Sequence, residues 1–135
     1  MLNDLICPLD SSPLTLKERT LICQNGHSFD LAKTGYANLL PVQNKRSKDP
    51  GDSKAMVQAR QAFLNSQAYL PIAQKLHQIL TEQIGLTESL NDDIRLLDAG
   101  CGEGYYLSYL AAQEGYQLKS SVGLDISKWA VAAAS

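Results

Sequence analysis

The sequence lacks the features that mark membrane, secreted and disordered chains. None of its apolar runs approaches the roughly 18 residues that a bilayer-spanning helix needs, and no basic lead into a hydrophobic segment stands at its start. Repeats and low-complexity tracts are also absent, apart from a short alanine-rich end. The 135 residues are 44% hydrophobic and 19% charged, which is typical of one soluble globular domain. We therefore expect no association with a membrane.

Cysteine is scarce, and its count is odd. Cys7 and Cys23 lie in a context that suggests metal binding, whereas Cys101 lies in a glycine-rich loop. Three thiols in these contexts do not form a disulfide framework, so the sequence predicts a cytoplasmic protein in a reducing compartment.

An excess of positive charge is also missing. The 12 basic and 14 acidic residues give a net charge of −2, which argues against a generally basic nucleic-acid binder. The first 60 residues nevertheless hold eight basic and six acidic residues, against four and eight in the remainder. Lys45, Arg46 and Lys48 form a local basic stripe that suits phosphate contacts, and a solvated loop is the alternative interpretation.

The first half of the chain reads as short segments followed by helices. Residues 1–30 form a short, polar segment with one strand expected at 20–22. Such a segment cannot hold a hydrophobic core by itself and needs a crosslink to stabilise it. Residues 31–52 read as a linker rich in loops. Ser53 can cap a helix whose apolar face is expected to hold Met56, Ala59, Phe63 and Leu64.

A second helix is expected from Pro71, which suits a first turn, to Gly85, which suits an end. Its apolar stripe consists of Ile72, Leu76, Ile79 and Leu80, and His77 is expected on its solvated surface. After this helix, the spacing of apolar residues changes from a helical period to that of alternating strands and helices. A strand at 94–99, a glycine loop, a helix from 105 to about 114, a strand at 121–124 and a helix capped by Ser127 predict a βαβ unit with parallel strands.

The glycine loop predicts a nucleoside-bearing cofactor. Gly100, Gly102 and Gly104 follow a buried strand directly, so a ligand can approach the backbone, although ordinary tight turns use glycine as well. Asp125 ends the neighbouring strand, where its carboxylate can accept hydrogen bonds from ribose hydroxyls. Asp98 precedes the loop, where it would repel a pyrophosphate but attract an ammonium group. The spacing G-x-G-x-G and this acid favour S-adenosylmethionine over NAD.

An N-terminal cluster suggests a metal site. Cys7-x2-Asp10 and Cys23-x3-His27 are separated by twelve residues, close to the two-pair layout of a small zinc site. Metal binding there would supply folding free energy that the small segment lacks. The alternative is that Cys7 and Cys23 are small buried hydrophobic residues and His27 is a turn residue.

Longer motifs resemble one family. The cluster Cys7…Cys23-x3-His27 and the stretches FDLAK, GYANLLPVQ and KRSKDPGD, at 29–33, 35–43 and 45–52, closely resemble the 23S ribosomal RNA guanine-N1 methyltransferases. The motif DAGCGEGYY at 98–106 is similar to that family's as well. The resemblance covers nearly the whole chain. It departs in two places, because Asp10 stands where the family has a cysteine ligand and the chain stops where the family continues.

The resemblance implies a zinc-binding module for RNA recognition joined to an S-adenosylmethionine-dependent, Rossmann-like domain. It implies methylation at N1 of a guanine in a 23S rRNA hairpin by a homodimer. By motif, Cys7, Cys23 and His27 match zinc ligands, whereas Tyr69, Gly102 and Glu103 match cofactor contacts.

We therefore expect an α/β protein with a zinc-ribbon-like module at 1–33, a basic linker at 34–53, a helical connector at 54–91 and the first βαβ unit of an incomplete methyltransferase sheet at 92–135. The acceptor pocket and catalytic base are expected on later strands, so the 135 residues alone are expected to be inactive. The alternatives are a non-catalytic RNA-binding module and an NAD-dependent enzyme.

Overall fold

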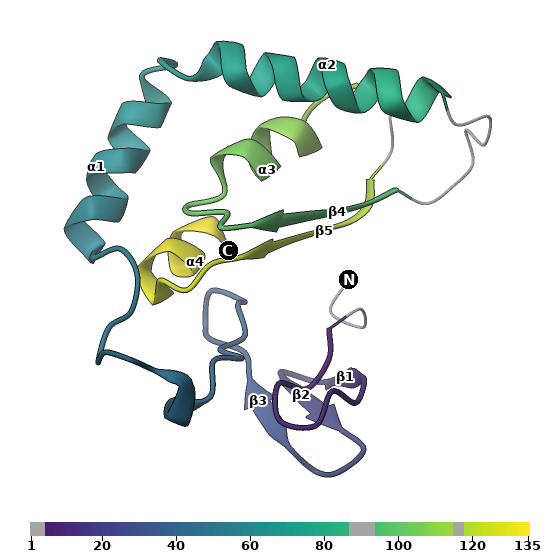
Figure 1. Cartoon of the computed structure of the whole chain (residues 1–135), viewed down its shortest axis with the longest axis vertical. Helices are drawn as coiled ribbons and strands as arrows, with labels where there is room; N and C mark the ends of the chain where they lie inside the picture. Colours follow the sequence, from purple (N-terminus) through teal and green to yellow (C-terminus); the bar gives the residue numbers. More distant parts are fainter. Residues whose placement is uncertain (1–4, 87–93, 115–117) are drawn as a thin grey trace.

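The computed structural model describes residues 5–86, 94–114 and 118–135. The described residues form a three-stranded sheet, two consecutive helices, and a parallel pair of strands with two more helices. Figure 1 shows the antiparallel sheet near the N-terminus. The predicted α/β class is confirmed, and so is the order of an N-terminal module followed by a βαβ unit.

The N-terminal sheet is antiparallel and consists of β1 (Leu14–Lys17), β2 (Thr20–Cys23) and β3 (Ser28–Asp30), in that order. Only the middle strand was predicted from the sequence. The flanking strands are short, and one face of each is solvated, so their apolar pattern is too brief to stand out. Pairing places Leu14 opposite Cys23 and Leu21 opposite Phe29.

The core of this module is very small. Its buried members are Cys7, Leu14, Leu21 and Cys23, and half-buried apolar side chains such as Phe29 surround them. Fully burying a leucine contributes only about 1.5–3 kcal/mol, and two of these four residues are candidate metal ligands. A core this small agrees with the prediction that a bound metal has to stabilise the module, and that dependence stays a prediction.

The predicted linker is irregular except for an isolated β-bridge between Ala37 and Leu31 and one 3-10 turn, η2 (Val42–Asn44). Its end docks on the last helix, α4 (Lys128–Ala134). The Ser127 hydroxyl donates to the Asp52 carbonyl oxygen at 2.7 Å, and Lys128 pairs with Asp49. The linker is thus fixed to the C-terminal unit at its far end.

The first connector helix, α1 (Lys54–Asn65), begins as predicted. The Ser53 hydroxyl accepts a hydrogen bond from the Met56 amide at 3.3 Å. The predicted apolar face is only partly right, because Leu64 is buried together with Val57 while Met56 and Phe63 are 56% and 49% exposed. The helix packs on α4, and its two buried side chains are one heptad apart, so the broader apolar stripe stays exposed.

The second connector helix, α2 (Leu70–Leu86), carries Pro71 in its first turn as predicted but continues past Gly85. Its buried position is Ala73, and the predicted stripe residues Ile72, Leu76 and Ile79 are exposed. The helix packs on α3 (Tyr105–Ala111), where a small side chain permits close approach. His77 lies one turn from Ala73 and is half-buried, so its predicted solvated position is wrong.

The C-terminal unit consists of two parallel strands, β4 (Ile94–Ala99) and β5 (Leu118–Leu124), joined through α3. The predicted bounds of β4 are confirmed, whereas β5 begins three residues before the predicted strand. The helix α3 ends at Ala111 instead of near Glu114, because the Gln113 side chain donates to the Tyr109 carbonyl oxygen and closes the last turn. Gly115, expected to end this helix, lies outside the described residues.

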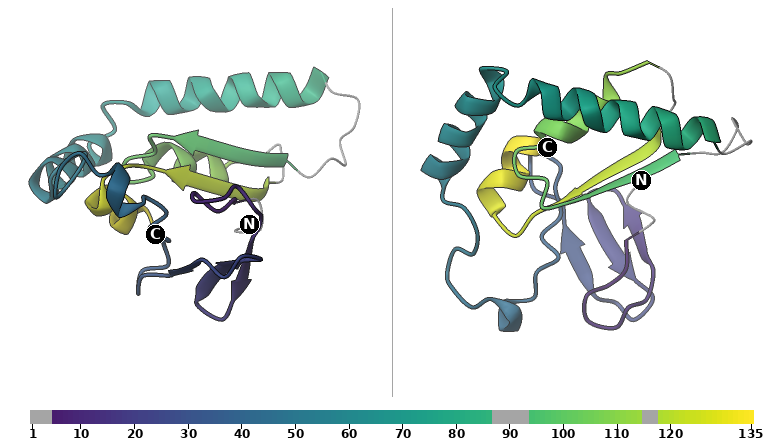
Figure 2. Two further views of the ribbon diagram at one scale, coloured as in Figure 1. Left: turned by 60° about the horizontal axis from the view of Figure 1, so that its bottom comes forward. Right: turned by 45° about the horizontal axis from the view of Figure 1, so that its top comes forward.

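Strands and helices of the fold support both candidate sites, the N-terminal cluster and the glycine loop. In Figures 1 and 2 the parallel strands lie between the N-terminal sheet and α2, and α1 stands beyond the carboxyl ends of β4 and β5. Among the described residues, no helix has the length and apolar character that a membrane span requires.

Candidate metal centre and cofactor loop

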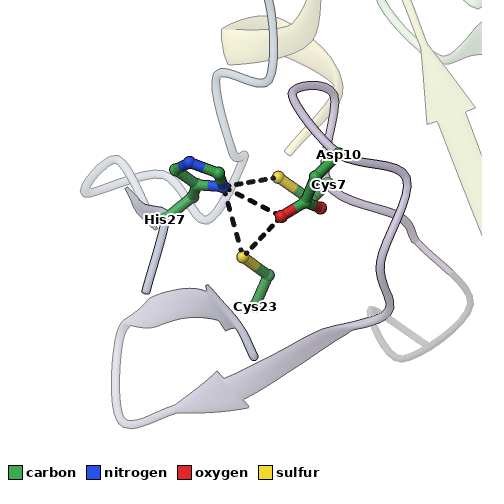
Figure 3. Close-up of side chains that lie close together, drawn as sticks. All are labelled: Cys7, Asp10, Cys23 and His27. Carbon is green, nitrogen blue, oxygen red and sulfur yellow. Dashed lines mark hydrogen bonds and ion pairs between the residues drawn. The ribbon is translucent and has the colours of Figure 1, made fainter. Parts of the chain in front are cut away.

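Two tight turns present the four residues of the N-terminal cluster (Figure 3). In the first turn, the Ser11 amide donates to the Cys7 carbonyl oxygen at 2.8 Å, and the Cys7 amide donates to the Ser12 carbonyl oxygen at the same distance. In the second, the Gly26 amide donates to the Cys23 carbonyl oxygen at 3.0 Å. Gly26 has a φ of +84°, which favours glycine there.

The four ligand atoms converge on one point. The His27 Nδ1 atom lies 3.5 Å from Cys7 Sγ, 3.4 Å from Cys23 Sγ and 3.1 Å from an Asp10 oxygen. Every pair of ligand atoms in the cluster is within 4.8 Å. Zinc bonds of about 2.0–2.3 Å in a tetrahedron place ligands about 3.3–3.8 Å apart. The cluster therefore fits one zinc ion, with two thiolates, an imidazole and a carboxylate as donors.

Asp10 is oriented by neighbours that leave it charged. One oxygen accepts hydrogen bonds from the Ser12 amide and hydroxyl, and the other accepts from the Asn25 side chain at 2.8 Å. The bonds from Ser12 and Asn25 hold the pKa of the Asp10 carboxyl well below its usual range. A preoriented, ionised carboxylate is the form in which aspartate binds a metal, and such outer hydrogen bonds fix ligand geometry.

The two thiols differ in their protonation. Burial raises the pKa of Cys7. Burial also opposes ionisation of Cys23, but a hydrogen bond from Ser12 and backbone amides lower its pKa overall. Cys23 is thus the thiol that is readier to lose its proton when a metal binds.

The predicted glycine loop lies between β4 and α3. Gly100, Gly102 and Gly104 have φ values of +89°, +56° and +80°, so all three need the left-handed conformation. The Gly100 and Cys101 amides donate to the carbonyl oxygen of Leu124 on β5 at 2.7 and 3.0 Å. These bonds tie the loop to the end of the neighbouring strand.

Asp125 lies beside this loop, as the sequence predicted. One of its oxygens accepts from the Gly102 amide at 3.0 Å, and the other accepts from the Ser127 amide at 2.8 Å. Each carboxylate oxygen can accept more than one hydrogen bond, so capacity for a ligand remains. Asp98 is half-buried near the end of β4, where it pairs in register with Gly123.

Sequence reasoning missed one residue of this site. Arg60 reaches from α1 to the loop, and its Nε atom lies 3.5 Å from an oxygen of Glu103. Its guanidinium also covers Gly102, where a Cβ atom would meet it at 3.4 Å. The local pattern around Arg60 is that of a charged residue on an exposed helix face, and only the packing of α1 onto α4 brings it to the loop.

The remaining predicted residues are spread around the same edge. Tyr69 is exposed, and its ring packs edge-to-face on Phe63 with centroids 5.2 Å apart. A cavity of about 790 Å³ borders Asp125 and also the linker residues Lys45 and Lys48. Arg46 and Lys48 are exposed, and Lys45 is half-buried. The structure thus brings part of the basic stripe and the cofactor loop to one cavity.

These features define a class of protein. A three-stranded module with a Cys, Asp, Cys and His cluster is a zinc ribbon, and it precedes a parallel unit with a glycine loop. Residues 5–48 match the zinc-ribbon family described as "RlmA, N-terminal".

Full-chain comparisons name the relatives. The chain is 37% identical over 125 residues to the 23S rRNA (guanine(748)-N(1))-methyltransferase of Streptomyces fradiae, and this match covers 93% of the chain and 41% of the relative. It is 33% identical over 135 residues to YxjB of Bacillus subtilis (strain 168), named as a candidate 23S rRNA (guanine-N(1)-)-methyltransferase, with 96% and 44% covered. A Micromonospora griseorubida protein with a similarly provisional name is 31% identical, with 95% and 46% covered. The predicted resemblance to the guanine-N1 methyltransferases is confirmed, and the chain spans less than half the length of these relatives.

Proposed function

We propose that this chain belongs to an S-adenosylmethionine-dependent enzyme that methylates N1 of a guanine in 23S rRNA. The relatives' names supply the reaction and the substrate. The observation that carries the proposal for this chain is the glycine loop flanked by the carboxylates Asp98, Glu103 and Asp125. Three acids around one loop disfavour a pyrophosphate and suit a ligand that carries cationic groups.

The cofactor site extends along the carboxyl ends of β4 and β5. When bound there, S-adenosylmethionine supplies an electrophilic methyl carbon on its sulfonium. Asp125 is placed to accept hydrogen bonds from the ribose, and Asp98 to attract the cofactor's ammonium group directly or through water. Tyr69 and the backbone of Gly100, Gly102 and Gly104 complete the proposed contacts. The unit corresponds to the first part of a Rossmann-like methyltransferase sheet, residues 92–135.

The N-terminal residues 1–33 form the proposed zinc module. Cys7, Asp10, Cys23 and His27 would hold the ion, and their separations fit a tetrahedral site. Zinc would act structurally here, because all four positions are taken by protein ligands and none is left open for a substrate. Its binding would stabilise a module whose apolar core is too small to hold it.

The linker at 34–53 is the proposed contact with RNA. Lys45, Arg46 and Lys48 would bind phosphates that flank the target guanine in its hairpin, which positions the RNA without reading its sequence. The guanine must leave its stack to reach the methyl group. The connector at 54–91 joins the linker to the catalytic unit, and a homodimer is the proposed assembly.

A methyl-transfer assay tests the proposal. We incubate the full-length protein with 23S rRNA and with S-adenosylmethionine that carries a labelled methyl group. Reverse transcription then maps the product, because N1-methylguanine blocks base pairing and stops the reverse transcriptase. We expect one new stop at a guanine and its loss in Asp125→Ala. RNA binding without cofactor binding would favour the non-catalytic module instead, and binding of NAD in place of S-adenosylmethionine would favour an NAD-dependent enzyme. The 135 residues alone are expected to give no stop.

A further inference from the structure

Glu103 is a buried carboxylate with unmet hydrogen-bonding capacity. Its side chain is only 4% exposed, and neither of its oxygens has a hydrogen-bond partner among the described residues. Its charge is balanced by Arg60 at 3.5 Å, without the geometry of a hydrogen bond. Buried carboxylates in folded proteins are normally both paired and hydrogen-bonded, because an unsatisfied one is costly. A group that donates several hydrogen bonds would fit this position better.

Arg60 has the opposite character. Its side chain is 46% exposed, and its ion pair with Glu103 runs through Nε. A guanidinium has five N–H donors in a planar fork, so most of them remain available for a second anion. The guanidinium lies against the loop, where a Cβ atom added at Gly102 would be in van der Waals contact with it at 3.4 Å.

A hollow lies beside this pair. It measures about 430 Å³ and is lined by Glu103, by Gln61 and Asn65 of α1, by residues of α3 and by Ala133 of α4. The helix that carries Arg60 therefore forms one wall of a space that reaches Glu103. Tyr106 is half-buried near the same pair. Its pKa is raised by burial and by the nearby Tyr105 and Tyr69, whereas Arg60 partly opposes this shift.

We propose that Arg60 and Glu103 bind the amino-acid end of S-adenosylmethionine as a zwitterion, with Glu103 hydrogen-bonding the α-ammonium group that Asp98 also attracts, and with Arg60 binding the α-carboxylate. The assignment rests on the cofactor site proposed above and adds Arg60, a positioning residue outside the glycine motif. On binding, the ammonium takes the place of Arg60 at Glu103, and the guanidinium turns to the carboxylate. Both protein charges stay paired throughout, and Glu103 gains the hydrogen bonds that it lacks.

Titration calorimetry with two ligands tests this exchange. One ligand is S-adenosylmethionine, and the other is its decarboxylated form, which keeps the sulfonium and the amine. In the full-length protein, we expect Arg60→Gln to weaken binding of S-adenosylmethionine about 10- to 100-fold, the usual effect of losing hydrogen bonds between charged groups. Binding of the decarboxylated ligand should be unchanged or tighter. Arg60→Lys keeps the charge next to Glu103 but not the fork, and should weaken only the carboxylate-bearing ligand, by less.

Lys75→Gln is the matched control, because Lys75 is an exposed helical cation bonded only to Gln78 among the contacts described. It should leave both affinities unchanged. Equal weakening of both ligands by Arg60→Gln, or no weakening of either, would overturn the assignment of Arg60 while leaving the cofactor site intact. If the natural protein binds neither ligand, the cofactor site falls and the assignment falls with it.

Discussion

Replacing Asp10 by alanine removes one of the four ligands of the proposed zinc site and three hydrogen bonds, two within the first turn and one to Asn25 of the second. The carboxylate lies 3.1 Å from His27 Nδ1 and 3.5 Å from Cys23 Sγ, within the spacing of a shared metal. It also accepts hydrogen bonds from the Ser12 amide and hydroxyl and from Asn25. Loss of the side chain therefore affects both the metal and the turn.

The expected loss of zinc affinity in Asp10→Ala follows from the number of ligands. Structural zinc in small modules binds with roughly 10–16 kcal/mol. If four ligands share that free energy evenly, alanine costs about 2.5–4 kcal/mol, which corresponds to about 70- to 900-fold in affinity. Asp10→Cys replaces the carboxylate by a softer thiolate, which zinc also accepts with bonds of about 2.3 Å. We expect this variant to bind zinc at least as tightly as the natural chain.

Competition with a chromophoric chelator measures zinc affinity, and thermal unfolding with and without the chelator measures the coupling to stability. Asp30→Ala is the matched control, because Asp30 lies in the same module and bonds to the Thr20 hydroxyl away from the cluster. It should bind zinc normally. The reasoning is refuted if Asp10→Ala binds zinc within about twofold of the natural chain, since the carboxylate would then contribute nothing to the site.

Three further outcomes can be measured. Gly51→Ala should destabilise the protein by about 2–4 kcal/mol in urea unfolding, because its φ is +79° and a Cβ would stand 2.9 Å from the Ser127 amide nitrogen. Gly26→Ala, with a similar φ and open surroundings, should cost only about 1–2 kcal/mol. Equal losses of stability in the two variants would contradict the clash at Gly51. Ser127→Ala should lower the free energy of unfolding by more than Ser53→Ala, since both serines are helix caps but only Ser127 is buried and also bonds Asp52. Equal losses would show that the bond to Asp52 adds no stability. The pKa of Cys101 is raised by burial and then by Asp125 and Asp98, so less thiolate is present at a given pH. Alkylation of Cys101 at pH 8, followed by mass spectrometry, should therefore be slower in the folded chain than in the urea-unfolded chain. Equal rates would exclude a protected thiol.

The sequence was sufficient where one local signal determines one structure. The bounds of β4, the caps at Ser53 and Ser127 and the positive φ angles of the loop follow from an apolar run, two hydroxyl residues and three glycines. These features depend on the backbone and on nearest neighbours. The Cys7 and His27 turns were predictable for the same reason, because short spacings limit how the chain can present its ligands.

The faces of the connector helices could not be predicted in this way. Periodicity shows which residues are apolar, but in α2 the small Ala73 is buried while the larger Ile72, Leu76 and Ile79 remain exposed. Which side of an amphipathic helix is covered depends on the partner helix, and that partner is set by the tertiary fold. The position of Arg60 was hidden for the same reason.

Ser127 connects the two proposed sites through one short series of hydrogen bonds. The Gly102 amide binds one oxygen of Asp125, the other oxygen accepts the Ser127 amide, and the Ser127 hydroxyl reaches the carbonyl of Asp52 at the end of the basic linker. Because Ser127 is only 1% exposed, water cannot replace these bonds without opening the structure. If RNA binds the linker as proposed, a shift of the linker would be absorbed at Ser127 or passed to Asp125, whose other oxygen holds the glycine loop. The proposed RNA contact and the proposed cofactor loop would thus share one support.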